Sequence, residues 1–363
     1  MGLILDYRKL ELKFKFDAGT SRGVLKTKTS WILKIFEKSD SKTFGFGEVS
    51  TIERLSFDYS VDFESELEEL KTQLAKLAKP SNKAEVFQLV KQLVKAGRPA
   101  IRFGLETALL DLLHGGKFKI FDNSFYQGDN GIPINGLIWM GDQEFMKNQI
   151  DEKLSHGCKC LKLKIGALDF EVEYELLKYI RSRYSADELI LRVDANGGFT
   201  TQEVLKKLER LDHFELHSIE QPIMPKQPEA MGLICEKSAV PVALDEELIG
   251  VFSTRDKIEL VDDIKPNFLV LKPSLLGGFV ATDEWIAIAE ARGIGWWITS
   301  ALESNVGLNA ICQYTAQHYY QGHQGLGTGQ LFENNIHSPL VIQGEEIVYN
   351  KTLSWDFITL GFD

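Results

Sequence analysis

Hydrophobic and polar residues alternate strictly near the start of the chain, over residues 9–16. A period of two turns successive side chains to opposite faces, so this pattern predicts a half-buried β-strand. Similar runs over 30–36 and 44–49 predict two further strands. Between the first two runs, residues 17–24 are rich in glycine and short polar side chains, which predicts a flexible lid loop.

The segment that follows has helical periodicity. Apolar residues recur at three- and four-residue steps from Phe63 to Leu77, before Pro80. This spacing predicts a helix with one apolar face, and a second helix is predicted over 84–96. Three strands followed by helices predict an α+β capping domain over residues 1–125.

From residue 132 onward, short apolar runs alternate with amphipathic stretches, as in a parallel sheet covered by helices. The predicted strands cover residues 132–137, 160–165, 189–194, 217–220, 242–245, 268–272, 294–299 and, more weakly, 324–328. Eight such units indicate an α/β fold, a closed (β/α)8 TIM-like barrel over residues 126–325. Residues 326–363 are expected to pack back toward the cap. A doubly wound open sheet is the structural alternative.

Composition and charge favour a small-molecule ligand. The 363 residues carry a formal net charge of −11 and contain no basic block, which disfavours nucleic acid and anionic membranes as partners. No apolar run or charged-then-apolar N-terminus suggests a membrane span or signal peptide, so a cytoplasmic location is expected. The four cysteines fit no zinc or redox motif and are expected to be buried or half-buried thiols. No glycine-rich loop indicates a nucleotide cofactor, and the oligomeric state is left open.

Charged side chains end five successive predicted strands, roughly one βα unit apart. They are Lys162 and Lys164, then Asp194, Glu220, Asp245 and Lys272. The carboxyl ends of parallel barrel strands all lie on one face, which is where barrel enzymes build their active sites. We therefore expect these groups to form one site, although each alone could be a helix cap or a solvated charge.

Three neighbouring carboxylates repel one another unless a cation compensates them, so Asp194, Glu220 and Asp245 predict a metal site. Oxygen ligands favour a hard ion such as Mg²⁺, with Mn²⁺ as a possible substitute. No histidine ends a predicted strand on this face, which disfavours zinc.

The second and sixth strands lie opposite each other in a ring of eight, so Lys164 and Lys272 should face each other across the site. A nearby dication and the neighbouring Lys162 should depress a lysine pKa and make a neutral amine available as a base. A metal-stabilised enolate would make the proton next to a substrate carboxylate removable. The predicted reaction is therefore proton abstraction next to a carboxylate of a small anionic substrate.

Five short motifs resemble the muconate-lactonising branch of the enolase superfamily. They are Lys162-Leu-Lys164, Arg192-Val-Asp194-Ala-Asn196, Ile219-Glu220-Gln221-Pro222, Ala243-Leu-Asp245-Glu246 and Leu271-Lys272-Pro273. The string over 272–278 and the string Thr299-Ser-Ala-Leu-Glu-Ser-Asn-Val-Gly307 are similar to the o-succinylbenzoate synthase family within that branch. Dipeptide epimerases of the branch carry an acidic pair at the eighth strand, whereas residues 325–329 contain no acid.

The resemblance implies a Mg²⁺-dependent dehydratase of menaquinone biosynthesis, in which Lys164 removes the α-proton and then protonates the departing hydroxide. Lys272 would stabilise the enolate from the opposite face, and Lys162 and Arg192 would tune and orient Lys164. Asn196 would support the metal site, and the substrate would contact Arg22 and its loop, Thr299, Ser300, Gly325 and Gly327. The alternatives are an N-acylamino acid racemase or dipeptide epimerase with two lysine bases, and a non-catalytic barrel that binds metal and carboxylate.

Overall fold

The alternating segments at the start of the chain form an antiparallel sheet in the computed structural model, which describes residues 2–20, 23–59, 62–356 and 360–362. Its strands, in spatial order, are β1 (Leu3–Thr20), β2 (Gly23–Glu37) and β3 (Asp40–Ser50). β1 and β2 stay paired as far as Thr20 and Gly23, so the described part of the predicted lid loop is the end of a long hairpin. Ser21 and Arg22 lie outside the described residues.

Helices α1 (Phe63–Leu74), α2 (Lys83–Leu93) and α3 (Pro99–Leu113) complete the cap. The first two match the predicted helices, whereas α3 was not predicted. Nearly every residue of α3 is buried, so its sequence lacks the polar stripe that reveals a surface helix. It approaches β3 so closely that a Cβ added at Gly47 would lie 2.0 Å from the carbonyl oxygen of Gly104.

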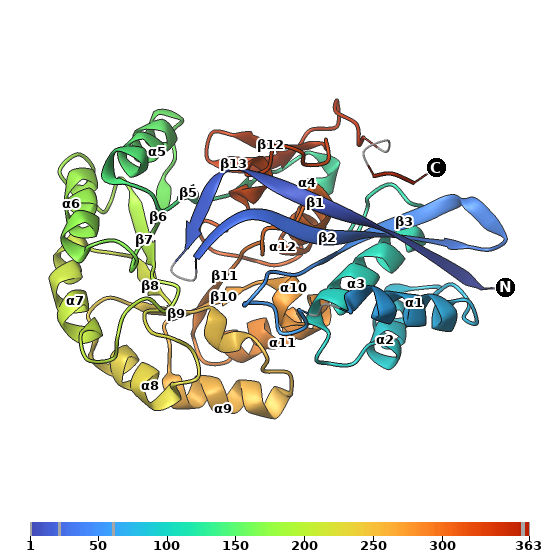
Figure 1. The fold of residues 1–363 in the computed structure, drawn as a ribbon, viewed down its shortest axis with the longest axis horizontal. Coiled ribbons are helices and arrows are strands. Elements are labelled where there is room, and N and C mark those ends of the chain that lie inside the picture. The colour runs from blue at the N-terminus through green and yellow to red at the C-terminus, as the bar shows by residue number, and fades with distance from the viewer. Residues whose placement is uncertain (1, 21–22, 60–61, 357–359, 363) are drawn as a thin grey trace.

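Seven parallel strands form most of the barrel wall, and hydrogen bonds connect them in chain order. They are β5 (Gly136–Ile138), β6 (Cys160–Lys164), β7 (Ile190–Asp194), β8 (Ser218–Glu220), β9 (Val242–Leu244), β10 (Phe268–Leu271) and β11 (Gly295–Ile298). The outer helices are α5 (Gln143–Ser155), α6 (Phe170–Arg181), α7 (Val204–Leu211), α8 (Pro228–Lys237), α9 (Thr254–Ile264), α11 (Gly278–Glu290) and α12 (Asn305–Thr315). A short helix, α10 (Pro273–Leu276), follows β10 directly. The predicted capped (β/α)8 fold is confirmed (Figure 1).

The eighth predicted strand is not a strand. Gln324 and Gly325 close the ring through two isolated parallel bridges, to Ile134 and to Thr299. The Gly325 amide donates to the carbonyl of Ile298 at 2.8 Å. Two residues are too few to give a recognisable apolar run, which explains why this segment was the weakest of the eight in the sequence.

The end of the chain returns to the first barrel strand and to the cap. The predicted first strand is split, because β4 (Ile132–Pro133) leaves the barrel sheet and pairs with β13 (Glu346–Tyr349). β13 also pairs with β12 (Leu340–Gln343), and short helix α4 (Ser124–Gln127) lies beside it. Beyond this sheet, the Trp355 ring stacks on Phe118 with centroids 3.9 Å apart.

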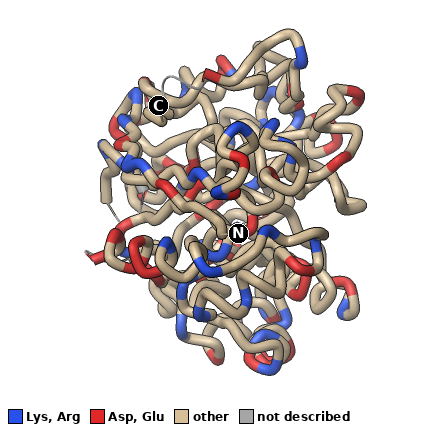
Figure 2. Tube along the Cα trace, turned by 90° about the vertical axis from the view of Figure 1, so that its right-hand side faces the viewer, with Lys and Arg blue, Asp and Glu red and all other residues tan. Residues whose placement is uncertain are grey.

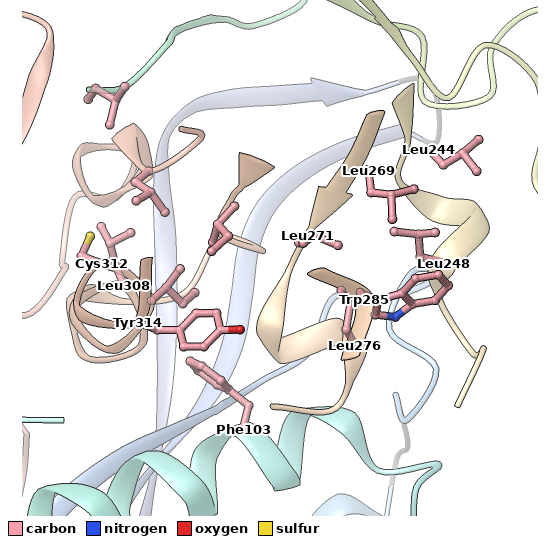
Figure 3. Close-up of a cluster of buried hydrophobic side chains, with 14 of the residues drawn as sticks. Phe103, Leu244, Leu248, Leu269, Leu271, Leu276, Trp285, Leu308, Cys312 and Tyr314 are labelled. Carbon is pink, nitrogen blue, oxygen red and sulfur yellow. The ribbon is translucent and has the colours of Figure 1, made fainter. Parts of the chain in front are cut away.

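Aromatic side chains join the cap to the barrel. Phe103 of α3 contacts Phe279 of α11 at a centroid distance of 5.4 Å, and Phe279 stacks on Tyr314 of α12 at 4.8 Å. Figure 3 shows Phe103 pointing from α3 toward Tyr314, inside a cluster of buried leucines. Removing one such ring costs about 3–5 kcal/mol, so this packing holds the two parts together firmly.

Basic and acidic positions are interspersed along the trace in the view of Figure 2. In the part of the chain that the structure describes, every helix is too short or too polar to cross a bilayer. The four cysteines are free thiols, three of them buried and Cys235 half-buried, as expected.

Candidate active site

Strand pairing brings the predicted charged side chains together at the carboxyl ends of the barrel strands. Lys164 is paired with Asp194, and Asp194 with Glu220, in the register of β6, β7 and β8. Asp245 follows β9 directly, and Lys272 follows β10 directly. The five groups therefore occupy five consecutive strand ends of one barrel face, as the sequence predicted.

An ammonium group bridges two of the carboxylates. Lys162 Nζ lies 2.9 Å from Asp194 Oδ2 and 2.6 Å from Glu220 Oε2. Lys164 Nζ lies 2.6 Å from the same Asp194 oxygen and 2.7 Å from Asn196 Oδ1. Asp194 and Glu220 are 0% and 1% exposed, so these charges compensate one another where water has little access.

Lys272 is held by a different carboxylate. Its Nζ forms an ion pair with Asp245 Oδ2. The backbone beside Asp245 is fixed by Gln221, whose Oε1 accepts the amide protons of Asp245 at 3.2 Å and Glu247 at 3.1 Å. The two lysines therefore stand on opposite strands of the barrel, each against its own acidic partner.

The surroundings shift the pKa of the two opposed lysines in opposite directions. Burial lowers the pKa of Lys164, and the positive charges of Lys162 and Lys272 add to this effect, against the attraction of Asp194. Burial also disfavours the charged form of Lys272, but nearby carboxylates, chiefly Asp245, outweigh it and raise its pKa. Lys164 is therefore the lysine that gives up its proton more readily, which is the property of a general base.

The pKa values of the two bridged carboxyls also diverge. Burial opposes ionisation of Asp194, but Lys162 and Lys164 hold its pKa well below the ordinary value. Burial first, and the charge of Asp194 second, raise the pKa of Glu220 well above its ordinary value. Lys162 contacts Glu220 Oε2, while Glu220 Oε1 accepts no hydrogen bond from the described residues. An added cation would relieve both conditions, so the donor set fits a hard divalent ion.

The carboxylates are not gathered around one point. Among the described residues, no three His, Cys, Asp or Glu side chains are placed so that they could hold a metal ion together. The contacts of Lys162 give the physical reason, because its ammonium group takes a position between Asp194 and Glu220. The negative charge and the oxygen atoms of the carboxylates suit a metal ion. Their positions, however, are those of carboxylates whose charge is compensated by a lysine.

A cavity of about 290 Å³ opens above these groups. The three lysines and Asn196 line its floor and sides, together with the residues predicted from the seventh and eighth strands: Thr299, Ser300, Gly325 and Gly327. Thr299 Oγ1 donates to the carbonyl of Gly325 at 2.7 Å, and a Cβ at Gly325 would lie 2.2 Å from that hydroxyl. Position 325 therefore requires glycine, because a larger residue would collide with the Thr299 hydroxyl in this wall of the cavity.

Several lining residues were not predicted from the sequence. The cap contributes the loop 52–55, and the barrel adds the rings of Trp139 and Trp297, whereas the hairpin end, 23–25, belongs to the loop that was expected to contact the substrate. The 52–55 loop follows β3 directly, and Arg54 within it has a left-handed backbone with φ of 63°. No local signal marks which cap loop reaches the barrel, so only the tertiary structure reveals these contacts.

Arg192 has a different environment from the one implied for it. Its guanidinium lies over the Trp297 ring, 4.2 Å from the centroid, and Nη1 donates to the carbonyl of His323 at 2.8 Å. Both contacts are with the seventh- and eighth-strand side of the barrel. Arg192 therefore supports the Trp297 wall of the cavity, and within the described residues these contacts lead away from Lys164.

The fold and the site together define a capped-barrel enzyme of the enolase superfamily. Residues 146–348 match the family model described as "Enolase C-terminal domain-like". The chain is 45% identical to the o-succinylbenzoate synthase of Desulfotalea psychrophila over 94% of this chain and 98% of that protein. The chain belongs to the o-succinylbenzoate synthase family.

Two further comparisons agree with this assignment. The crystal structure of MenC from Desulfotalea psychrophila superposes with a TM-score of 0.85 at 41% identity, covering 96% of this chain and 100% of that one. An N-succinylamino acid racemase from Thermus thermophilus is 29% identical over 83% of this chain and 79% of that protein. Members of the enolase superfamily use a divalent metal ion, typically Mg²⁺, and act on small molecules.

Proposed function

We propose that this protein catalyses the dehydration of 2-succinyl-6-hydroxy-2,4-cyclohexadiene-1-carboxylate to o-succinylbenzoate, a step of menaquinone biosynthesis in the cytoplasm. The observation that carries the proposal is the pair Lys164 and Lys272 on opposite strands of one cavity, with three carboxylates between them. The similarity to o-succinylbenzoate synthase over nearly the whole chain supplies the substrate.

Lys164 acts first, as the general base. Its pKa is lowered by burial and by neighbouring ammonium groups, so a neutral amine can take the proton from the carbon next to the substrate carboxylate. The C–H electron pair passes to the carboxylate as an enolate. When it returns, the C–O bond to the ring hydroxyl breaks and the ring becomes aromatic. Lys164 gives its proton to the departing hydroxide, so water leaves and no other reactant is consumed.

Lys272 keeps its charge throughout. Nearby carboxylates raise its pKa, so it presents an ammonium group from the opposite side of the cavity and stabilises the developing enolate. Asn196, which accepts a hydrogen bond from Lys164, orients the base. Asp194, Glu220 and Asp245 would hold Mg²⁺, or Mn²⁺ in its place, and the ion would stabilise negative charge on the substrate carboxylate.

The rest of the chain shapes and covers the cavity. Cap residues 1–125 bring the hairpin and the 52–55 loop to the mouth of the barrel, residues 126–325. Thr299, Ser300, Gly325 and Gly327 would contact the substrate, and Arg22 is proposed to join them. Beyond its lysines the cavity has both apolar and polar lining side chains, which suits a ring that carries carboxylates.

An N-acylamino acid racemase is the second candidate, because a lysine on each side of the cavity could serve two enantiomers. The test compares the purified protein on the cyclohexadiene precursor and on both enantiomers of an N-succinylamino acid. We expect kcat/KM for dehydration to exceed that for racemisation by at least about a hundredfold, a difference of about 2.7 kcal/mol in the barrier. Faster racemisation would reverse the assignment.

Metal removal belongs to the same assay. Treatment with EDTA should abolish dehydration, and Mg²⁺ or Mn²⁺ should restore it, because the carboxylates cannot assist an enolate without a compensating dication. Full turnover in the presence of EDTA would contradict the assignment of Asp194, Glu220 and Asp245.

A further inference from the structure

Three buried charged side chains meet where the cap touches the barrel. They are Lys28 on β2, Glu48 on β3 and Glu303 in the segment between β11 and α12, and we call them the interface triad. Lys28 is 5% exposed, and both glutamates are 0% exposed. Burying charged groups costs desolvation energy that their mutual attraction recovers only in part, so their presence here calls for a role other than holding the fold together.

Glu48 binds the start of α12 from the cap. Its Oε1 accepts the Ser304 amide proton at 2.9 Å, and its Oε2 accepts the Ser304 hydroxyl at 2.5 Å and the Gly307 amide at 2.9 Å. A Cβ at Gly307 would lie 3.0 Å from Glu48 Oε2, so glycine leaves room for the carboxylate. A cap residue therefore completes the first turn of a barrel helix.

Glu303 connects two segments that line the catalytic cavity. Its Oε1 accepts the hydroxyl proton of Ser274, and its Oε2 accepts the Ala301 amide proton at 2.7 Å. Ser274 is only two residues beyond Lys272, and Ala301 lies in the 299–302 wall of the cavity. One carboxylate thus ties the segment of the sixth-strand lysine to the seventh-strand wall.

Lys28 compensates both glutamates from the hairpin. Its Nζ donates to Ser50 Oγ and, at 3.2 Å, to Ser30 Oγ, and the charges of Glu48 and Glu303 both act on it. Three residues before Lys28, Leu25 lines the cavity. The interface triad therefore joins the three segments that carry Leu25, Lys272 and Ala301.

We propose that Glu303 is a positioning residue for the reaction, which sets Lys272 and the 299–302 wall relative to each other, with Lys28 and Glu48 locking the cap hairpin onto that arrangement. The proposal rests on the proposed function only for its kinetic readout. Glu303 is not one of the residues found to line the cavity, and it acts through Ser274 and Ala301. A misplacement of about 1 Å in such a group can cost about a hundredfold in rate.

The kinetic test uses Glu303→Gln, with Glu106→Gln as its matched control. Glutamine has one acceptor oxygen, so it cannot receive both the Ser274 hydroxyl and the Ala301 amide. Because Lys272 acts on charge that develops in the transition state, we expect kcat to fall about tenfold to a hundredfold while KM stays within about threefold. Glu106 is also a buried carboxyl between cap and barrel, but it binds the Phe279 amide away from the cavity.

The control should keep kcat within about twofold of the wild type, because its side-chain oxygen can still accept the Phe279 proton. The proposal is overturned if Glu303→Gln has wild-type kcat, or if Glu106→Gln loses as much. Ser274→Ala supplies an independent check: removing the hydroxyl that anchors the Lys272 segment should lower kcat in the same direction, and an unchanged kcat would count against the proposal.

A second measurement does not need the substrate. Amide hydrogen exchange should accelerate in peptides that contain residues 273–277 and 299–304 of Glu303→Gln, and stay unchanged there in Glu106→Gln. If the wild type fails to dehydrate the precursor, the proposed function falls, while this exchange comparison still decides the positioning role. Equal exchange in the two variants would overturn it.

Discussion

The three lysines of the site have the same side chain but different surroundings. Lys162 is paired with two carboxylates, Lys164 shares one of them with an asparagine, and Lys272 has a carboxylate on the far side of the cavity. These differences in burial and neighbours give three identical side chains different proton affinities. The division of roles between base and enolate stabiliser follows from environment.

Glu106, behind the site, gives a pH prediction. Burial raises its pKa from 4.5 to about 8, against the amide of Phe279 and the charge of Arg102. In the unfolded chain this carboxyl ionises near 4.5, so the folded state binds more protons between about pH 4.5 and 8. Its contribution to stability is therefore full below pH 4.5 and is lost as the pH rises to about 8.

Glu106→Gln should remove this contribution. We expect the free energy of unfolding of the wild type, relative to the variant, to fall by roughly 3–5 kcal/mol between pH 5 and 8. Urea titrations of both proteins across that range measure it. The comparison is needed because Asp58 and Asp111 also have raised pKa values, about 6 and about 7, and titrate in the same window. Parallel curves for the two proteins would show that Glu106 ionises normally.

Among the secondary-structure elements, those with one clear periodicity could be predicted. The two-residue alternation revealed β1 to β3, and the short apolar runs revealed β6 to β11. Helix α3 was not predicted because it is buried on all sides. The eighth strand was predicted where the structure has only two bridging residues. Residues 18–20 and 23–24 of the predicted lid loop are paired backbone, because the glycines among them are compatible with the end of a hairpin.

The candidate site was predictable for a related reason. Each βα unit presents one strand end to the same face, so spacing alone located the lysines and carboxylates. The lining residues from the cap loop 52–55 and the ring of Trp297 could not be found in this way. Contacts between segments far apart in the sequence leave no local pattern, and the contact of Arg192 with the Trp297 ring could not be foreseen for the same reason.

The hairpin β1–β2 gives a prediction about substrate binding. Phe14 on β1 is 6% exposed and packs against the rings of Phe332 at 4.7 Å and Trp139 at 6.4 Å, which fixes the hairpin on the barrel. Phe14→Ala should cost about 3–5 kcal/mol of stability and loosen the hairpin end that lines the cavity. We expect KM for the precursor to rise at least about fivefold, since closure over the substrate weakens.

Phe125→Ala is the control for this variant. Its ring is 1% exposed and packs beside Tyr349 near the C-terminal sheet, away from the cavity. It should lose similar stability in thermal unfolding while KM stays at the wild-type value. A similar rise of KM in both variants would mean that general loosening, and not the hairpin, explains the effect.

At the scale of the whole molecule, the cap and barrel work as one unit. The barrel supplies the charged strand ends, and the cap supplies a hairpin and a loop that cover them (Figure 1). The aromatic contacts around Phe279 and the interface triad join the two parts on the side of the sixth and seventh strands. Covering a cavity in this way limits the access of water to an enolate and strengthens the electrostatic contribution of the lysines.

The most direct test of this account compares Lys164→Ala with Lys272→Ala on the cyclohexadiene precursor, with product formation followed by NMR in single-turnover conditions. Loss of the only base should reduce Lys164→Ala to the uncatalysed background. Lys272→Ala keeps the base and should retain turnover, lowered roughly 10²- to 10³-fold by the missing charge stabilisation. A Mg²⁺-induced rise in melting temperature of both variants would show that the carboxylates remain intact. If Lys164→Ala turns over as fast as Lys272→Ala, or faster, the assignment of Lys164 as the base is wrong.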